Sequence, residues 1–141
     1  DISINDESYL RLMKTMNFKS TNATYLLLFL ETCINTDTLT VPLNYTLEHI
    51  YPQKNKINLK NQSLMDNIGN LTLYEGNNSE NGHKGNSSLG SKLYDKKKFS
   101  YKGSSSKITR QISEKYDSFN ENNIIERNEE LIILLNKYTN Y

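Results

Sequence analysis

Apolar residues recur at helical spacing in two stretches near the start of the chain. The first stretch predicts an amphipathic helix over residues 7–18. Its apolar positions are Tyr9, Leu10, Leu12, Met13 and Met16. The second stretch predicts a more buried helix, which begins at Thr21 or Asn22 as a cap and runs to about Cys33. Polar residues 35–37 then interrupt the pattern.

Two segments in the middle of the chain have the mixture of β-branched, aromatic and polar residues that is typical of strands. The first covers residues 39–50 and ends before Pro52, which supplies no hydrogen-bond donor to a sheet. The second covers residues 70–74 and follows Gly69. Between them, residues 53–66 are polar and rich in lysine. This composition predicts a loop, with a helical turn around Leu64 and Met65.

The C-terminal half returns to helical spacing after a Gly/Asn/Ser-rich stretch, residues 75–88, which predicts another loop. A helix is predicted over residues 89–99, weakened by Gly90. Serines 104–106 can cap a second helix, which carries Ile108 and Ile112. The last predicted helix, residues 122–138, has one apolar stripe. Its members are Ile124, Leu131, Leu135 and Tyr138. Together these elements predict an α+β fold that is mostly helical, with a small central β-hairpin followed by a helix.

Composition limits the classes of protein to which the chain can belong. Its 141 residues fit one compact domain. The longest apolar run, residues 25–30, is far shorter than the roughly 20 residues that span a bilayer. A single cysteine, Cys33, excludes an internal disulfide and any cysteine-based zinc site. The chain starts at Asp1, without a methionine or an apolar leader, so we expect a piece of a longer protein that is not secreted.

The formal net charge of +1 conceals an uneven distribution. Residues 51–110 carry eleven Lys or Arg against four acids, whereas acids outnumber bases on both sides of this segment. A basic centre favours a polyanionic partner. The alternative from charge alone is a solvated, lysine-rich surface without a partner.

Three short motifs follow one another through this basic centre. Glu48-His49-Ile50-Tyr51-Pro52 comes first, and residues 68–73 then read Ile-Gly-Asn-Leu-Thr-Leu. After these comes a run that reads Asn-x-x-x-Gly-Asn-x-x-Leu-x-x-Lys over residues 81–92. The three motifs in this order resemble the HNH (ββα-metal) endonucleases. They are most similar to the C-terminal nuclease domain of GmrSD-type modification-dependent restriction enzymes and their anti-phage relatives.

The resemblance implies a role for several residues in phosphodiester hydrolysis. His49 would be the general base, because an imidazole with a pKa of about 6.5 can take a proton from water near neutral pH. Glu48 and Asn81 would bind a divalent metal, Mg²⁺ or Mn²⁺, since hard cations prefer oxygen ligands. Such an ion acts as a Lewis acid and stabilises the leaving oxygen. The stretch before Asn81 is about two residues longer than expected, so Asn77 and Asn78 compete with it as the ligand.

Other residues would support this centre. Asn70, on the second strand, would hold the loop after His49 through side-chain-to-backbone hydrogen bonds. Lys92 and Asn86 would lie near the scissile phosphate or support the helix that carries the metal ligand. A basic surface next to the motif would follow the DNA backbone with salt-dependent affinity. Its residues are Lys92, Lys96, Lys97, Lys98, Lys102, Lys107 and Arg110.

We therefore expect one nuclease domain with a helical lead-in (residues 1–38), a ββα-metal core (residues 39–99) and C-terminal helices (residues 100–141). The resemblance implies a metal-dependent DNA endonuclease of a cytoplasmic bacterial restriction or anti-phage defence protein. Phage or modified DNA would be its substrate, and target choice would lie in an N-terminal sensor or NTPase-like region or in a partner subunit. Two alternatives stay open: a non-catalytic nucleic-acid-binding module that keeps the hairpin for its shape, and a helical protein-docking domain.

Overall fold

The centre of the fold is a two-stranded antiparallel sheet. The computed structural model describes residues 20–35, 45–75 and 89–139. Strand β1 (Tyr45–His49) pairs with β2 (Leu71–Glu75), and the register places Glu48 opposite Thr72 at the end of the hairpin that leads to His49. This arrangement confirms the α+β fold with a small central hairpin.

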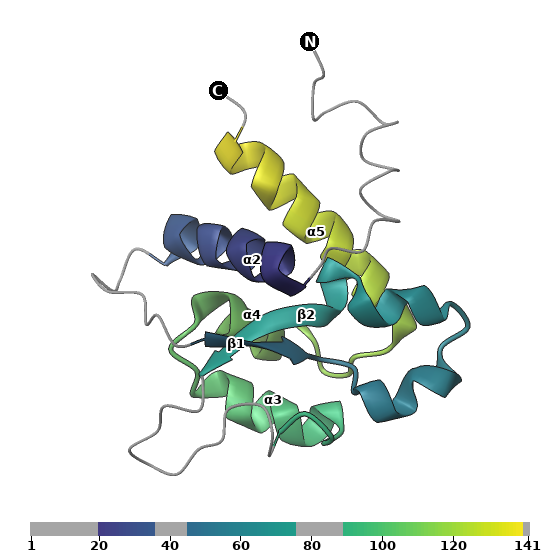
Figure 1. Ribbon diagram of the computed structural model, residues 1–141. Helices are drawn as coiled ribbons and strands as arrows, with labels where there is room; N and C mark the ends of the chain where they lie inside the picture. Colours follow the sequence, from purple (N-terminus) through teal and green to yellow (C-terminus); the bar gives the residue numbers. More distant parts are fainter. Residues whose placement is uncertain (1–19, 36–44, 76–88, 140–141) are drawn as a thin grey trace.

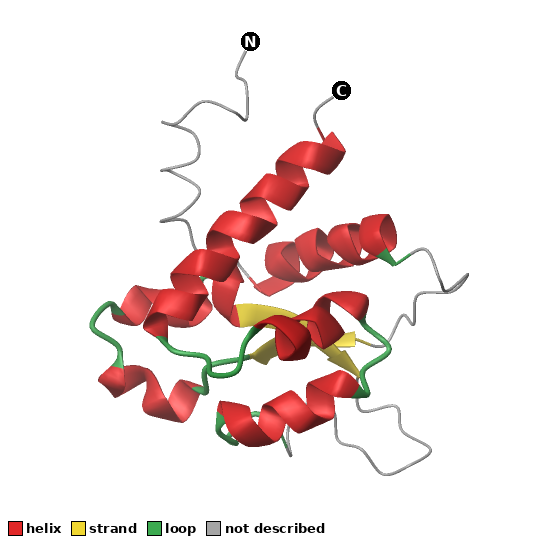
Figure 2. Cartoon of the chain, turned by 180° about the vertical axis from the view of Figure 1, so that it is seen from behind, coloured by secondary structure: helices red, strands yellow, loops and turns green. Residues whose placement is uncertain are grey.

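Four described helices surround this hairpin. They are α2 (Ser20–Ile34), α3 (Tyr94–Lys102), α4 (Lys107–Lys115) and α5 (Glu121–Thr139). In Figures 1 and 2 α2 and α5 lie above the hairpin and α3 lies below it. Helix α4 lies behind the strands in Figure 1, and in Figure 2, which is seen from the other side, it crosses in front of them. The hairpin is therefore covered on both faces.

The two faces of the hairpin belong to two separate hydrophobic clusters. Leu71 and Leu73 of β2 pack with apolar residues of α2, including Leu27. Tyr74 faces the other way and packs with Tyr101 of α3. Successive side chains of a strand point to opposite faces, so neighbouring residues of β2 enter different clusters. The same alternation on β1 separates the side chains of its last two residues.

The connection between the strands contains three short 3₁₀ helices. They are η1 (Gln53–Asn58), η2 (Gln62–Asp66) and η3 (Ile68–Asn70). The prediction of a plain loop over residues 53–66 is wrong, but the predicted turn around Leu64 and Met65 is confirmed as η2. Both residues are buried in the cluster that contains Tyr74, which explains why this polar segment folds into ordered turns.

The third 3₁₀ helix packs directly on α5 because Gly69 has no side chain. A Cβ at this position would lie 2.1 Å from the backbone oxygen of Ile124 and 2.8 Å from the backbone nitrogen of Asn128. The buried guanidinium of Arg127 donates from Nη1 to three carbonyls at the junction of η3 and β2, at 2.6–3.3 Å. Residues of α5 thereby set the path by which the chain enters the second strand.

Most predicted elements are confirmed, with shifts at their ends. Helix α2 begins at Ser20, and the predicted cap of α4 is confirmed because the Ser106 hydroxyl accepts from the backbone of Thr109. The predicted helix over residues 89–99 starts too early, because Leu93 keeps an extended backbone and α3 begins after it. The placement of Asn70 on the second strand is wrong, since it ends η3. The predicted helix over residues 7–18, residues 39–44 of the first strand and the loop over residues 76–88 lie outside the described residues.

Candidate active site

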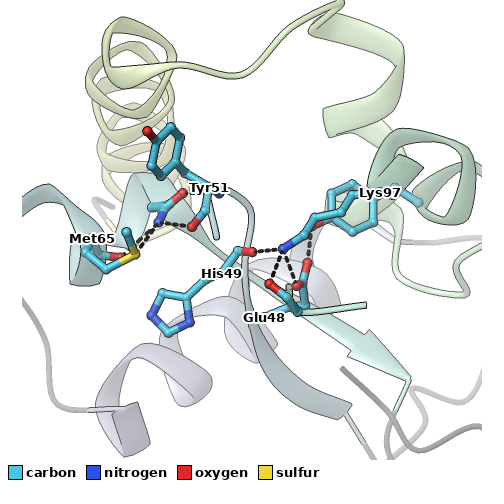
Figure 3. Close-up of polar contacts among 8 residues, drawn as sticks. Glu48, His49, Tyr51, Met65 and Lys97 are labelled. Carbon is cyan, nitrogen blue, oxygen red and sulfur yellow. Dashed lines mark hydrogen bonds and ion pairs between the residues drawn. The ribbon is translucent and has the colours of Figure 1, made fainter. Parts of the chain in front are cut away.

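His49 lies at the end of β1, and its ring points away from the Glu48 side chain (Figure 3). The imidazole is 19% exposed, and its Nε2 lies 3.0 Å from Oδ1 of Asp66, the last residue of η2. Alternation along the strand is the reason that the two neighbouring side chains diverge. The histidine therefore reaches solvent together with a carboxylate, while Glu48 faces the interior.

The carboxylate of Glu48 is fully buried between the hairpin and α3. Lys97 Nζ donates to its Oε1 at 2.8 Å, and the Tyr101 hydroxyl donates to its Oε2. The same ammonium also donates to the backbone oxygens of His49, at 2.5 Å, and of Gly90, at 3.2 Å. Figure 3 shows the Lys97 side chain reaching both residues of the strand. One lysine thus links the carboxylate, the histidine backbone and the turn before α3.

Burial shapes the ionisation of this cluster. Loss of hydration lowers the pKa of Lys97, and the nearby Glu48 raises it in part. Burial, and after it the charge of Glu48, raises the pKa of the Tyr101 hydroxyl well above its usual range. Tyr101 therefore stays a hydrogen-bond donor. The expectation that Lys97 follows the DNA backbone is wrong, because this side chain has no exposed surface.

Lys97 and Tyr101 were not predicted as partners of Glu48, although their spacing in the sequence indicates a shared helix face. Tyr94, Lys97 and Tyr101 recur at intervals of three and four residues, which places them on one face of a helix. All three are buried. Lys92, the lysine assigned to the site from the motif, is exposed in the turn before α3.

Asn70 ties the segment that follows His49 to the segment that precedes Asp66. Its Oδ1 accepts from the backbone nitrogen of Tyr51 at 2.7 Å, and its Nδ2 donates to the Tyr51 oxygen at 3.2 Å and to the Met65 oxygen at 2.9 Å. The side chain is fully buried. These are side-chain-to-backbone bonds of the kind expected for Asn70, and a catalytic role for it stays a prediction.

In this arrangement the described residues leave no open oxygen of Glu48 for a divalent metal. Both of its oxygens already accept from buried donors, and no buried polar atom of Glu48 is left without a partner. Within residues 20–35, 45–75 and 89–139, no group of three or more His, Cys, Asp and Glu could hold a metal ion. The other expected ligand, Asn81, and the residues Asn77, Asn78 and Asn86 lie outside the described part of the chain. Metal binding by Glu48 and Asn81 stays a prediction.

The remaining basic residues are distributed over α3, α4 and the turn before α3. Lys96 and Lys102 are exposed on α3. Lys98 pairs with Asp117 at 3.0 Å, and Arg110 donates to a backbone oxygen at 2.7 Å. The backbone N–H of Lys107, at the first position of α4, donates to both oxygens of the buried Glu31 carboxylate. DNA contact by the exposed members of this set stays a prediction.

The family model for the C-terminal domain of GmrSD restriction endonucleases matches residues 3–134. The chain belongs to this family. The resemblance of the three motifs to the C-terminal domain of GmrSD-type restriction enzymes is therefore confirmed. No curated protein and no solved structure matches the chain. The matched range of this GmrSD C-terminal domain includes His49, Asp66 and the buried cluster around Glu48.

Membership of the GmrSD family indicates an endonuclease of a restriction system, which acts on DNA, and it suggests the use of a divalent metal. In the part of this GmrSD domain that the structure describes, no helix is both long and apolar enough to cross a membrane.

Proposed function

We propose that this GmrSD C-terminal domain is an HNH-class endonuclease that hydrolyses phosphodiester bonds of DNA with His49 as the general base. The observation that carries the proposal is the setting of His49. Its imidazole reaches solvent at the end of the hairpin, where Nε2 contacts Asp66 and Lys97 donates to the backbone oxygen of His49. In a restriction endonuclease domain, a partly exposed imidazole with a carboxylate partner is suited to take the proton of an attacking water.

Buried polar contacts keep the base in place. Lys97 holds the backbone oxygen of His49, and Asn70 holds the backbone of Tyr51 two residues later. Neither side chain has exposed surface, so neither touches substrate in this arrangement. Both are positioning residues. Their effect is to keep the end of β1 rigid, which general-base catalysis requires because proton transfer depends on close, oriented contact.

We include a divalent cation, Mg²⁺ or Mn²⁺, in the proposal because the GmrSD nuclease family suggests that the domain uses one. When bound, such an ion supplies Lewis-acid stabilisation of the charged phosphate and of the leaving oxygen. Glu48 offers no open oxygen to it, so the proposal gives the described residues no step that passes through the ion. Asn81, or Asn77 or Asn78 in its place, is the ligand that the motif indicates.

Nicking of supercoiled plasmid DNA in the presence of Mg²⁺ or Mn²⁺ tests the proposal. We expect His49→Ala to abolish nicking while the melting temperature and DNA affinity stay close to those of the wild type. His49 is only partly buried, so its truncation leaves the core intact. If His49→Ala nicks DNA as fast as the wild type, His49 is not the base.

The Glu48 carboxylate is fully buried and both of its oxygens accept hydrogen bonds, so it has no oxygen free for a metal ion in this arrangement. This observation favours a second candidate function, a nucleic-acid-binding module without catalysis. Titration with Mn²⁺, followed by calorimetry, separates the two functions. A catalytic domain binds Mn²⁺, and Asn81→Ala weakens binding more than Asn77→Ala or Asn78→Ala does. DNA binding without any Mn²⁺ binding or nicking would instead establish the module.

In the cell, we propose that the domain acts in the bacterial cytoplasm as the effector of a restriction or anti-phage defence protein. Recognition of phage or modified DNA would come from an N-terminal sensor or NTPase-like region, or from a partner subunit. Joining this chain to such a region should confer target preference on nicking that the chain alone lacks.

A further inference from the structure

We infer that Asp66 is a positioning residue for His49, which fixes the tautomer of its imidazole and leaves Nδ1 as the atom that accepts the proton from water. This inference rests on the proposed function and adds to it a residue outside the three sequence motifs. The contact that carries it joins His49 Nε2 to Asp66 Oδ1 at 3.0 Å.

The direction of this hydrogen bond follows from the chemistry of its partners. An ionised carboxylate can only accept, so the ring nitrogen that faces Asp66 carries the hydrogen. In a neutral imidazole the other nitrogen, Nδ1, then holds the lone pair. Once His49 has taken a proton, the negative charge of Asp66 also stabilises the imidazolium that forms. The pair therefore has both properties that a general base needs: a defined acceptor atom and a partner for the developing charge.

The backbone holds Asp66 at the correct distance. Asp66 is the last residue of η2, and two hydrogen bonds hold the next residue, Asn67. The Asn67 backbone nitrogen donates to the Leu64 oxygen, and the Asn67 side chain accepts from the Gly69 nitrogen. On the other side of Asp66, the Met65 oxygen accepts from Asn70. The histidine and the aspartate are thus braced by one network.

Asn70 connects the two halves of this network. The same amide nitrogen donates to Tyr51, two residues after His49, and to Met65, one residue before Asp66. A single buried side chain therefore sets the separation of the two segments that carry the pair. The Gly-Asn-Leu-Thr-Leu motif has a physical reason here, because its asparagine aligns the base with its partner.

The exposure of Asp66 makes the inference testable without loss of the fold. The Asp66 side chain is 56% exposed, in contrast to the sealed carboxylate of Glu48. Removing the Asp66 carboxylate leaves no buried charge and no core cavity. Its matched control is Asp117, another exposed aspartate that forms an ion pair at 3.0 Å, with Lys98.

Single-turnover nicking of plasmid DNA with Mn²⁺ is compared for the wild type, Asp66→Asn, Asp66→Ala and Asp117→Asn. We expect the two Asp66 variants to lose roughly ten- to a hundredfold in rate, as part of the contribution of general-base catalysis, with unchanged DNA affinity and melting temperature. We expect Asp117→Asn to keep its rate.

A second readout does not depend on activity. Nitrogen-15 NMR at a pH where the imidazole is neutral reports the tautomer of His49, whose signals are assigned by their loss in His49→Ala. We expect hydrogen on Nε2 in the wild type and a mixture of tautomers in Asp66→Ala. If the wild type nicks DNA but Asp66→Ala matches its rate and tautomer, the inference is overturned. If the wild type does not nick DNA, the proposed function fails, and an unchanged tautomer in Asp66→Ala would then overturn the pairing as well.

Discussion

The ammonium of Lys97 lies 2.8 Å from the carboxylate of Glu48, and neither side chain has any exposed surface. This ion pair joins the central hairpin to α3 at the base of the candidate active site. Removing two charges from water is costly, and the attraction between them offsets that cost only while both are present. The hydroxyl of Tyr101 and the backbone oxygen of His49 complete the hydrogen bonding around the pair.

Replacement of Lys97 tests how much the fold depends on this pair. We expect Lys97→Met to lower the free energy of unfolding by about 3–5 kcal/mol, because it leaves the buried carboxylate of Glu48 without a counter-ion. Urea denaturation measures the change. Lys98→Met is the matched control in the same helix: its ion pair with Asp117 is partly exposed, and we expect a loss of less than about 1 kcal/mol.

The double variant Glu48→Gln, Lys97→Met removes both charges. We expect it to recover part of the stability that Lys97→Met loses, since no unpaired charge is left inside. Equal stability of Lys97→Met and Lys98→Met would show that Glu48 finds another partner or solvent when Lys97 is absent.

The close approach of η3 to α5 predicts that an alanine at Gly69 destabilises the domain, whereas an alanine at Gly103 hardly changes its stability. We expect Gly69→Ala to destabilise the domain by about 1–3 kcal/mol or more, because its Cβ would lie 2.1 Å from a backbone oxygen of α5. At Gly103 the nearest atom would be 3.9 Å away and φ is −95°, so Gly103→Ala should be nearly neutral. Thermal denaturation of the two variants measures the difference. Similar melting temperatures would contradict the packing of η3 on α5.

Exposed lysines of α3 predict a salt-dependent contribution to DNA affinity. We expect the variant Lys96→Ala, Lys102→Ala to reduce the slope of log K against log salt by about 1.8, since each phosphate contact contributes about 0.9 for duplex DNA. Lys115→Ala, Lys137→Ala removes the same charge from the acidic C-terminal segment and should leave the slope nearly unchanged. Fluorescence anisotropy at several salt concentrations measures both slopes. Equal slopes for the two variants would remove α3 from the DNA-binding surface.

The raised pKa of the Tyr94 hydroxyl predicts that the domain loses stability at alkaline pH. Burial, helped by the charge of Asp117, raises the pKa of this hydroxyl to about 12, and smaller effects come from Tyr116, Arg127 and Asp95. Because the pKa of this hydroxyl is higher in the folded than in the unfolded state, its contribution to the stability of the folded state is complete below pH 10. This contribution is lost as the pH rises to about 12. The free energy of unfolding should therefore fall by roughly 2–3 kcal/mol over this range.

Tyr94→Phe isolates this effect from the other buried groups. The hydroxyl donates to the backbone oxygens of Ile112 and Tyr116, so its removal also lowers stability at neutral pH. We expect the gap between wild type and variant to narrow from pH 10 to pH 12, as measured by urea denaturation. A constant gap would mean that Tyr94 ionises equally in the folded and unfolded states.

Predictions from the sequence were most accurate where structure depends on residues close together in the chain. The periodicity of α5 and the Ser106 cap of α4 are local features, and both are confirmed. Errors arose where tertiary packing overrides local preference. The lysine-rich segment before β2 folds into η1 and η2, and Leu64 and Met65 of η2 are buried in the core. The start of α3 was placed too early because the extended backbone of Leu93 has no signature in its composition.

The sequence alone determined the family, the order of the elements and the position of His49 at the end of a strand, because motifs and hydrophobic periods are local. Only the tertiary structure decided which charged groups meet. Lys97 is 49 residues from Glu48, and Asp66 is 17 residues from His49. In a chain with so many lysines and acids, local spacing does not distinguish a buried partner from a solvated one. The packing of α3 on the hairpin buries the Glu48 carboxylate with its lysine, whereas η2 ends with Asp66 beside His49 at the surface.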